Sequence, residues 1–260
     1  MAWGLRRHRL DRILLDHAES LGARVISERR TPEDTDVVAS GRPVWVDRLG
    51  DYAAGRLLAR VIPPGRGATR ISAVSKRTSA AKPAMRPSCS FQYGCVGVNA
   101  VEEGLVTVCG LVREHLLREG DFQPDALLSS RPELAARLGR LSRATDWLIE
   151  GPVITSDDSI WRRSGPYRAG DALASIEPFT GSGVLNALLT GQMAGMAAAR
   201  RTPVGEYCRR AESVLGRPLL VGSAIGAALD TGWARILAPV VPVGWLFRLS
   251  RPASPAPGAW

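Results

Sequence analysis

One stretch of the sequence, residues 167–195, constrains the fold more than any other. A short strand-like run ends in Gly170-Asp171, a loop follows, and Gly181-Ser182-Gly183 opens a long run of small and apolar residues. We predict a strand, a loop and one helix over residues 182–200. The glycines let a ligand approach the backbone, and free N–H groups at the helix start favour a phosphate or an electron-rich ring. Asp171 can accept hydrogen bonds from a sugar hydroxyl.

Composition and charge narrow the class of protein. The 260 residues are 45% hydrophobic and 23% charged, as in ordinary globular domains. The formal charge of +9 favours anionic partners. Basic doublets are scattered along the whole chain, however, so we do not predict a nucleic-acid binder. Four cysteines without a Cys-x-x-Cys pair and three histidines give no metal site of the usual spacing.

Hydrophobic periodicity predicts the remaining elements. Residues 93–101 and 105–112 are two apolar runs around a Glu-Glu-Gly turn, which is typical of an antiparallel hairpin. Residues 66–87 offer no strand, and the surrounding segment is rich in Arg, Pro, Gly and Ser. The other expectations are a helix over 9–21, a strand over 23–27, a helical segment over 125–142 interrupted at Pro132, and a strand over 147–154. Helices are expected over 204–249, with breaks at Pro218, Pro239 and Pro242.

The run GDALASIEPFTGSGVLNALLTGQMAG, from Gly170 to Gly195, resembles the second FAD-binding motif of the FAD-dependent monooxygenase and geranylgeranyl-reductase-like flavoprotein superfamily. In that family a strand-end Gly-Asp precedes a Pro-x-x-Gly-x-Gly loop and a helix rich in small residues. The resemblance implies that Asp171 contacts the ribityl chain of FAD and that the pyrimidine edge of the flavin faces the loop and helix start. The candidate cofactor-binding residues of this motif are Gly170, Asp171, Pro178, Gly181, Ser182, Gly183 and Val184.

A second match lies near the N-terminus. The sequence RHRLDRIL, from Arg7 to Leu14, resembles the family's Arg-x-x-Leu-Asp-x-x-Leu helix start. The resemblance implies that Arg7 lies near the cofactor. From the residues alone, the end of a basic amphipathic helix explains the same pattern equally well.

The sequence also departs from the family. It contains no Gly-x-Gly-x-x-Gly unit for the ADP half of FAD and no Asp-Gly segment in residues 66–87. Two interpretations are open: a truncated or frame-disrupted product, which we favour, or a variant whose partner chain supplies the missing nucleotide-binding unit. The expected fold class is α/β, a truncated, Rossmann-like FAD-binding domain with an antiparallel β-sheet substrate region and C-terminal helices.

The expected organisation follows from these matches. Residues 1–28 and 151–203 form the remnant of the FAD-binding domain, and residues 29–87 are irregular and partly disordered. Residues 88–150 form the β-sheet segment of the substrate domain. Residues 204–250 are the C-terminal helices, and residues 251–260 are a loose tail rich in Pro, Ala and Gly.

The function implied by the resemblance is an FAD-dependent oxidoreductase of the monooxygenase or double-bond reductase type. Its substrate would be an apolar or aromatic organic molecule and its electron donor NAD(P)H. Loss of the ADP-binding unit would weaken binding of FAD, and no catalytic residue is identified. The alternatives are a flavoprotein remnant without activity, or a basic protein associated peripherally with a membrane.

The C-terminal region bears on localisation. Asp230 and Arg235 interrupt the apolar stretch from 219 to 247, which indicates amphipathic helices rather than a membrane anchor. No signal peptide is recognised, so we expect a cytoplasmic protein that contacts a membrane peripherally if it contacts one. Trp233 and Trp245 are expected in the core or at an interface.

Overall fold

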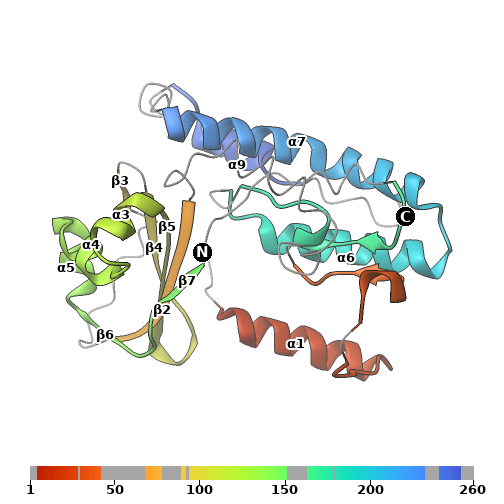
Figure 1. Ribbon diagram of the computed structural model, residues 1–260, viewed down its shortest axis with the longest axis horizontal. Helices are drawn as coiled ribbons and strands as arrows, with labels where there is room; N and C mark the ends of the chain where they lie inside the picture. Colours follow the sequence, from red (N-terminus) through yellow and green to blue (C-terminus); the bar gives the residue numbers. More distant parts are fainter. Residues whose placement is uncertain are drawn as a thin grey trace. The chain divides into compact units, whose positions relative to one another are not determined.

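A computed structural model describes residues 5–28, 30–41, 68–77, 89–91, 94–150, 163–177, 180–231 and 240–252. The chain forms two compact units. The first comprises Met1–Ser27 and Gly55–Val153, and the second comprises Glu28–Ala54 and Ile154–Trp260. Figure 1 labels the helices and strands of both units.

The first unit is built on a six-stranded sheet in which every pairing is antiparallel. Strands β4 (Gly94–Ala100) and β5 (Leu105–Arg113) form the predicted hairpin around the 3-10 turn η3 (Glu102–Gly104). The order β3-β4-β5-β2-β6 continues the sheet, and β7 also pairs with β2. The remaining strands are β2 (Ala68–Arg77), β3 (Cys89–Phe91), β6 (Leu141–Arg143) and β7 (Leu148–Glu150).

Three short helices pack against this sheet (Figure 1). They are α3 (Glu114–Glu119), α4 (Pro124–Ser129) and α5 (Pro132–Leu138), and a proline starts each of the last two. Alternate β5 side chains are buried because a strand turns every second residue to the same face. The core joins residues of the hairpin and of the three helices: Val96, Val108, Val112, Leu117, Leu128 and Leu134.

Helix α1 (Arg7–Ser20) is tied to the β4–β5 turn by charge. Arg6, its N-cap residue, donates from Nε to Oε1 of Glu102 at 2.6 Å and from its backbone N–H to Oε2 at 3.1 Å. Burial raises the pKa of Glu102, but the hydrogen bonds from Arg6 outweigh it and lower that pKa to about 2. The same contact raises the pKa of Arg6. No residue of α1 is buried, so these polar contacts connect the helix to the β4–β5 turn.

The second unit contains the segment singled out by its sequence. Strand β8 (Tyr167–Arg168) pairs in parallel with β1 (Val37–Val38), which follows the 3-10 turn η1 (Pro32–Asp34). After β8 comes the turn η5 (Gly170–Ala172), and later helices α6 (Gly183–Ala199), α7 (Val204–Thr231) and α9 (Val243–Leu249). The core of the unit draws on η5, α6 and α7, with Leu173, Met193, Ala194, Tyr207, Ala211 and Leu215 among its buried members.

The structure confirms the fold class: helices and a small antiparallel sheet, with a parallel strand pair leading into the Gly-Asp turn. The helix α1, the hairpin, the interruption at Pro132, strand β7, helix α6 and the break at Pro242 all lie where the sequence predicts them. Pro178, Pro239 and the tail beyond residue 252 lie outside the described residues. The predicted division of the chain into domains stays a prediction, and α1 falls in the compact unit that holds the sheet.

Leu141 and Ser142, expected at the end of a helical segment, belong to strand β6 instead. Three further expectations about single elements are wrong. Residues 23–27 form no strand, and Val25 and Ile26 are more than half exposed. Residues 68–77 do form one, β2, whose partner β5 lies far away in the sequence. Pro218 does not break α7, although proline removes one helical hydrogen bond. Pro218 is itself buried and its neighbour Leu215 is only 1% exposed, so packing offsets that loss.

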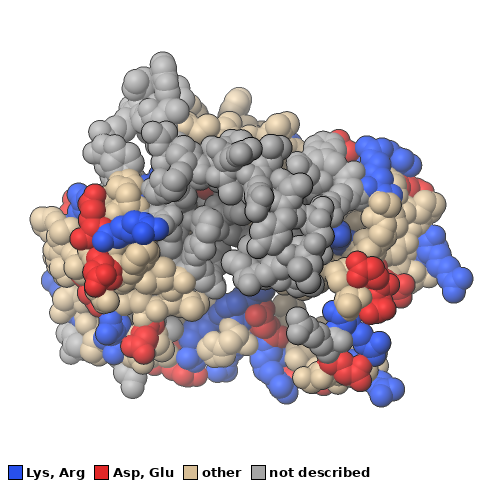
Figure 2. Space-filling model, viewed as in Figure 1, with Lys and Arg blue, Asp and Glu red and all other residues tan. Residues whose placement is uncertain are grey.

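The described surface carries charges of both signs. On the face shown in Figure 2, basic and acidic side chains lie interspersed. Ion pairs at i,i+4 spacing lie on the described helices, such as Arg12 with Asp16 and Arg210 with Glu206. Within the described ranges, no helix combines the length and the apolar character that crossing a membrane requires.

Candidate functional site

The strand-end Gly170 is held against helix α6. Its φ of +58° lies in the left-handed region, which glycine adopts without strain. A Cβ at this position would come within 3.3 Å of the Cβ of Ala187. The backbone N–H of Gly170 donates to the hydroxyl of Thr190 at 2.8 Å, and that hydroxyl donates to the carbonyl of Asn186 at 2.6 Å. The Gly-Asp turn therefore lies directly on the second turn of the helix.

The start of α6 leaves backbone donors free of helical partners. The first described bond across this end runs from the N–H of Asn186 to the carbonyl of Ser182 at 2.9 Å. The N–H groups of Gly183, Val184 and Leu185 therefore have no acceptor within the helix. Together they carry the positive end of the helix dipole.

Two hydroxyls brace the loop before this helix. The hydroxyl of Thr180 contacts that of Ser182 at 2.7 Å and lies 2.8 Å from the carbonyl of Glu177, to which it can donate. Ser182 is 1% exposed, and its hydroxyl can donate to the carbonyl of Ser250 at 3.3 Å. Gly181, with φ +63°, makes the turn between them. The loop is thus fixed both to itself and to the residue that follows α9.

Asp171 presents an acceptor in the same unit as these donors. It is half-buried, and its carboxylate makes no hydrogen bond or ion pair with any residue the structure describes. The first turns of α6 also expose apolar side chains: Val184 is 41% and Leu188 47% exposed. This unit therefore offers three kinds of contact to a planar polar ring that carries a polyol chain. The carboxylate can accept from hydroxyls, the N–H groups can donate to the ring, and the apolar side chains can pack against it.

The structure places most sequence-predicted site residues in this unit. Gly170, Asp171, Gly181, Ser182, Gly183 and Val184 lie on the turn, loop and helix start just described. Pro178 lies outside the described residues. Arg7 belongs to the other unit, where its Nε is 2.6 Å from Asp11 and its side chain is 67% exposed. The cofactor contacts assigned to these residues stay predictions.

Sequence reasoning missed two residues of the site. Thr190 is fully buried and joins the Gly-Asp turn to α6. Asn186 is 3% exposed, and neither polar atom of its amide has a partner in the described part of the chain. A buried, unpaired amide is rare, because such groups normally find hydrogen bonds. The available signal was periodicity: Asn186, Thr190 and Met193 fall on one helical face, where polar residues need partners.

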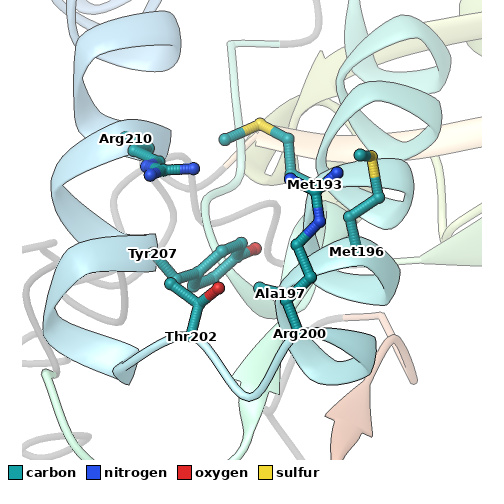
Figure 3. A pocket seen from close by; sticks show the side chains of 7 residues that line it. All are labelled: Met193, Met196, Ala197, Arg200, Thr202, Tyr207 and Arg210. Carbon is teal, nitrogen blue, oxygen red and sulfur yellow. The ribbon is translucent and has the colours of Figure 1, made fainter. Parts of the chain in front are cut away.

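A small cavity lies at the opposite end of α6. It measures about 20 Å³, room for roughly one water molecule. The side chains of Arg200, which follows α6, and of Arg210 on α7 extend toward it (Figure 3). The other lining residues are Met193, Met196, Ala197, Thr202 and Tyr207. It is separated from the glycine loop by most of α6, so it is not part of the Gly-Asp site.

Two buried groups lie near that cavity. Burial raises the pKa of Tyr207, whose hydroxyl donates to the carbonyl of Arg168. Burial also raises the pKa of the Cys208 thiol, although Arg163 and Arg168 act in the opposite direction. Both groups therefore stay protonated at neutral pH and serve packing. No cluster that could hold a metal ion occurs among the residues with described positions.

Comparison with solved structures identifies the fold. The flavin-dependent brominase Bmp2 matches over 96% of this chain and 70% of its own, with a TM-score of 0.64 and 16% identity. The flavin-dependent halogenase CmlS matches over 97% of this chain and 50% of its own, with a TM-score of 0.59 and 16% identity. A flavoprotein/dehydrogenase from Cytophaga hutchinsonii matches over 95% and 67%, with a TM-score of 0.56 and 14% identity.

These likenesses concern the fold. No family model matches the sequence, and no curated protein matches it. The chain has the fold of flavin-dependent halogenases and related flavoproteins, and it spans between half and about 70% of the length of the three proteins compared.

Proposed function

We propose that this protein is an FAD-dependent oxidoreductase whose Gly170–Val184 segment contacts the flavin half of the cofactor. The observation that carries the proposal is the unpaired carboxylate of Asp171, in the unit where α6 begins with free backbone donors. The fold shared with flavin-dependent enzymes supports the same assignment.

The residues present fit a flavin. A hydroxylated chain needs an acceptor, which Asp171 provides, and a ring with carbonyl oxygens needs donors, which the N–H groups of Gly183 and Val184 provide. The exposed side chain of Val184 offers apolar contact. The helix dipole at this end stabilises negative charge. When bound, FAD supplies the redox chemistry; the protein binds and orients it.

The substrate class and the reductant are part of the proposal. We infer an apolar or aromatic organic substrate and NAD(P)H as the electron donor, with monooxygenation, halogenation or double-bond reduction as the reaction class. These assignments are supported by the resemblance of the Gly170–Gly195 motif and by the structural neighbours, which include a brominase, a halogenase and a flavoprotein/dehydrogenase.

A further part of the proposal concerns the ADP half of FAD. The sequence contains no Gly-x-Gly-x-x-Gly unit. We propose that a partner chain carrying such a unit completes the cofactor site, and that the present chain holds the isoalloxazine and ribityl portions. In that case riboflavin and FMN bind this chain alone about as well as FAD does, because the adenosine adds no contact.

The test is a titration of the purified chain with riboflavin, FMN and FAD, in which the quenching of flavin fluorescence measures binding. Asp171→Asn keeps the side-chain shape but removes the charge, so the affinity should fall by roughly ten- to a hundredfold. The matched control is Asp146→Asn, an exposed aspartate of the other unit, which should bind as the wild type does. Equal affinity of the Asp171 variant and the wild type, or no flavin binding at all, would overturn the site assignment.

The same titration tests the partner chain. Binding of FAD much tighter than of riboflavin would show that this chain holds the adenosine itself and would remove the partner from the proposal.

A further inference from the structure

The end of the chain has an unusual composition. Residues 231–260 include no Asp, Glu or Lys, but they include three arginines and four large aromatic residues. The arginines are Arg235, Arg248 and Arg251, and the aromatic residues are Trp233, Trp245, Phe247 and Trp260. Basic residues combined with Trp, Phe and Leu, without acidic ones, are typical of segments that lie in the interface of an anionic membrane.

The described part of this segment exposes its aromatic residues. Helix α9 (Val243–Leu249) leaves Trp245 67% and Phe247 53% exposed, and Val240 before it is 73% exposed. Burying such side chains is favourable, so an exposed group of them marks an interaction surface. We call Val240, Trp245, Phe247, Arg248 and Arg251 the α9 patch.

The cations lie beside the aromatic side chains. The guanidinium of Arg251 stacks on the Phe247 ring, 3.6 Å from its centroid. Arg248 is exposed in the last turn of the helix. Stacking keeps the Arg251 charge next to the apolar surface. Exposed aromatic and arginine side chains on one short helix can place rings among acyl chains while the guanidinium groups contact headgroup phosphates.

Helix α9 is attached to the rest of the second unit. Ser250 is 3% exposed, and its carbonyl accepts from the buried Ser182 hydroxyl at 3.3 Å. Helix α9 also packs on α7, in which Leu220 is 74% exposed. The patch is therefore carried on a rigid support and is not the loose end of a chain. Because α9 has only seven residues, about 10 Å of helix, it can lie on a bilayer but not cross it.

We propose that the α9 patch docks this protein on the surface of an anionic membrane. The charge of the segment indicates this partner. Arginines without acidic neighbours attract anionic lipid headgroups and repel a basic surface. The inference does not depend on flavin binding.

The experiment is co-sedimentation of the full chain with phosphatidylcholine vesicles, with and without phosphatidylglycerol, at low and high salt. The wild type should bind the anionic vesicles about tenfold more strongly than the neutral ones, and less at high salt. The double variant Trp245→Ala/Phe247→Ala should lose about tenfold in binding, since it removes the apolar contact. Arg248→Glu should weaken binding mainly at low salt.

Two control variants and a fold check complete the design. Leu148→Ala removes an exposed apolar side chain of the other unit, and Arg24→Glu reverses an exposed charge there. Both should bind as the wild type does, and circular dichroism should show all variants folded. Equal binding to neutral and anionic vesicles, or an unaffected double variant, would overturn the proposal. If the protein self-associates without binding vesicles, and the double variant does not, the α9 patch instead contacts a second copy of this chain.

Discussion

Thr190 on helix α6 accepts a hydrogen bond from the backbone N–H of Gly170, the residue at which the strand β8 segment turns toward the loop. One hydroxyl thus joins the two halves of the proposed flavin contact: the Gly-Asp turn, and the helix whose N-terminus the glycine loop forms. The same hydroxyl donates to the carbonyl of Asn186, so both of its hydrogen-bonding roles are used.

Replacing Thr190 by valine should destabilise the protein. Valine has the same shape but leaves the half-buried N–H of Gly170 without its acceptor, a loss of about 1–3 kcal/mol in the free energy of unfolding. Thr190→Ser keeps the hydroxyl and removes one methyl group, so it should lose about 1 kcal/mol. Urea denaturation of the three proteins measures both effects. A valine variant as stable as the wild type would show that the hydrogen bond does not hold the turn.

Gly170→Ala should also destabilise the fold. Alanine in the left-handed region is unfavourable by about 1–2 kcal/mol, and the new methyl group would contact Ala187 at 3.3 Å. Gly191→Ala is the matched control, because this glycine lies inside α6 with no other atom within 4 Å of an added Cβ. That change should stabilise the helix by about 0.5–1 kcal/mol. Thermal unfolding should therefore move in opposite directions for the two variants; a shift in the same direction would contradict the backbone argument.

Local patterns in the sequence were sufficient for the elements whose signals are local. Helix α6 was predicted from the long run of small and apolar residues after Gly181-Ser182-Gly183. The β4–β5 hairpin was predicted from two apolar runs around a Gly-containing turn. Strand β2 could not be found this way. Most of its residues are small or charged, and pairing with β5 makes them a strand, although Lys76 pairs with Leu105 and Ala68 with Arg113, far along the chain.

The converse error occurred at residues 23–27, where an apolar run predicted a strand. A strand needs a partner, and in the described part of the chain this run has none. At the site, the glycines and Asp171 were recognisable because their chemistry is unusual at a strand end. Thr190 was not, because a threonine inside a helix is ordinary until its hydrogen-bond partner, Gly170, is known.

Acid should loosen α1 from the hairpin. Because Arg6 lowers the pKa of Glu102 from 4.5 to about 2 in the folded protein, the pair contributes stability above the unfolded pKa. That contribution is lost as the pH falls from about 4.5 toward about 2. Glu102→Gln removes the charge at every pH, so its melting temperature should lie below that of the wild type at pH 7 and converge with it near pH 2. The control is Glu119→Gln in the same unit, for which no such convergence is expected.

Alkali should act through Tyr207. Burial raises its pKa above the usual 10.0, so the folded state keeps the phenol neutral and bonded to the carbonyl of Arg168. Stability from this group is present below pH 10 and is lost as the pH rises beyond it, because the unfolded chain ionises first. The ring also packs edge-on against Tyr167, with centroids 5.5 Å apart. Tyr207→Phe keeps this packing and loses about 1 kcal/mol at neutral pH.

The pH dependence of that variant separates the hydroxyl from the ring. Urea denaturation at pH 7 and above pH 10 should show the wild type losing its advantage over Tyr207→Phe in alkali. Tyr207→Ala should lose about 3–5 kcal/mol at both pH values, because it empties the space between α6 and α7. A constant difference between the wild type and the phenylalanine variant across the range would mean that the Tyr207 hydroxyl titrates normally and is not enclosed as the structure places it.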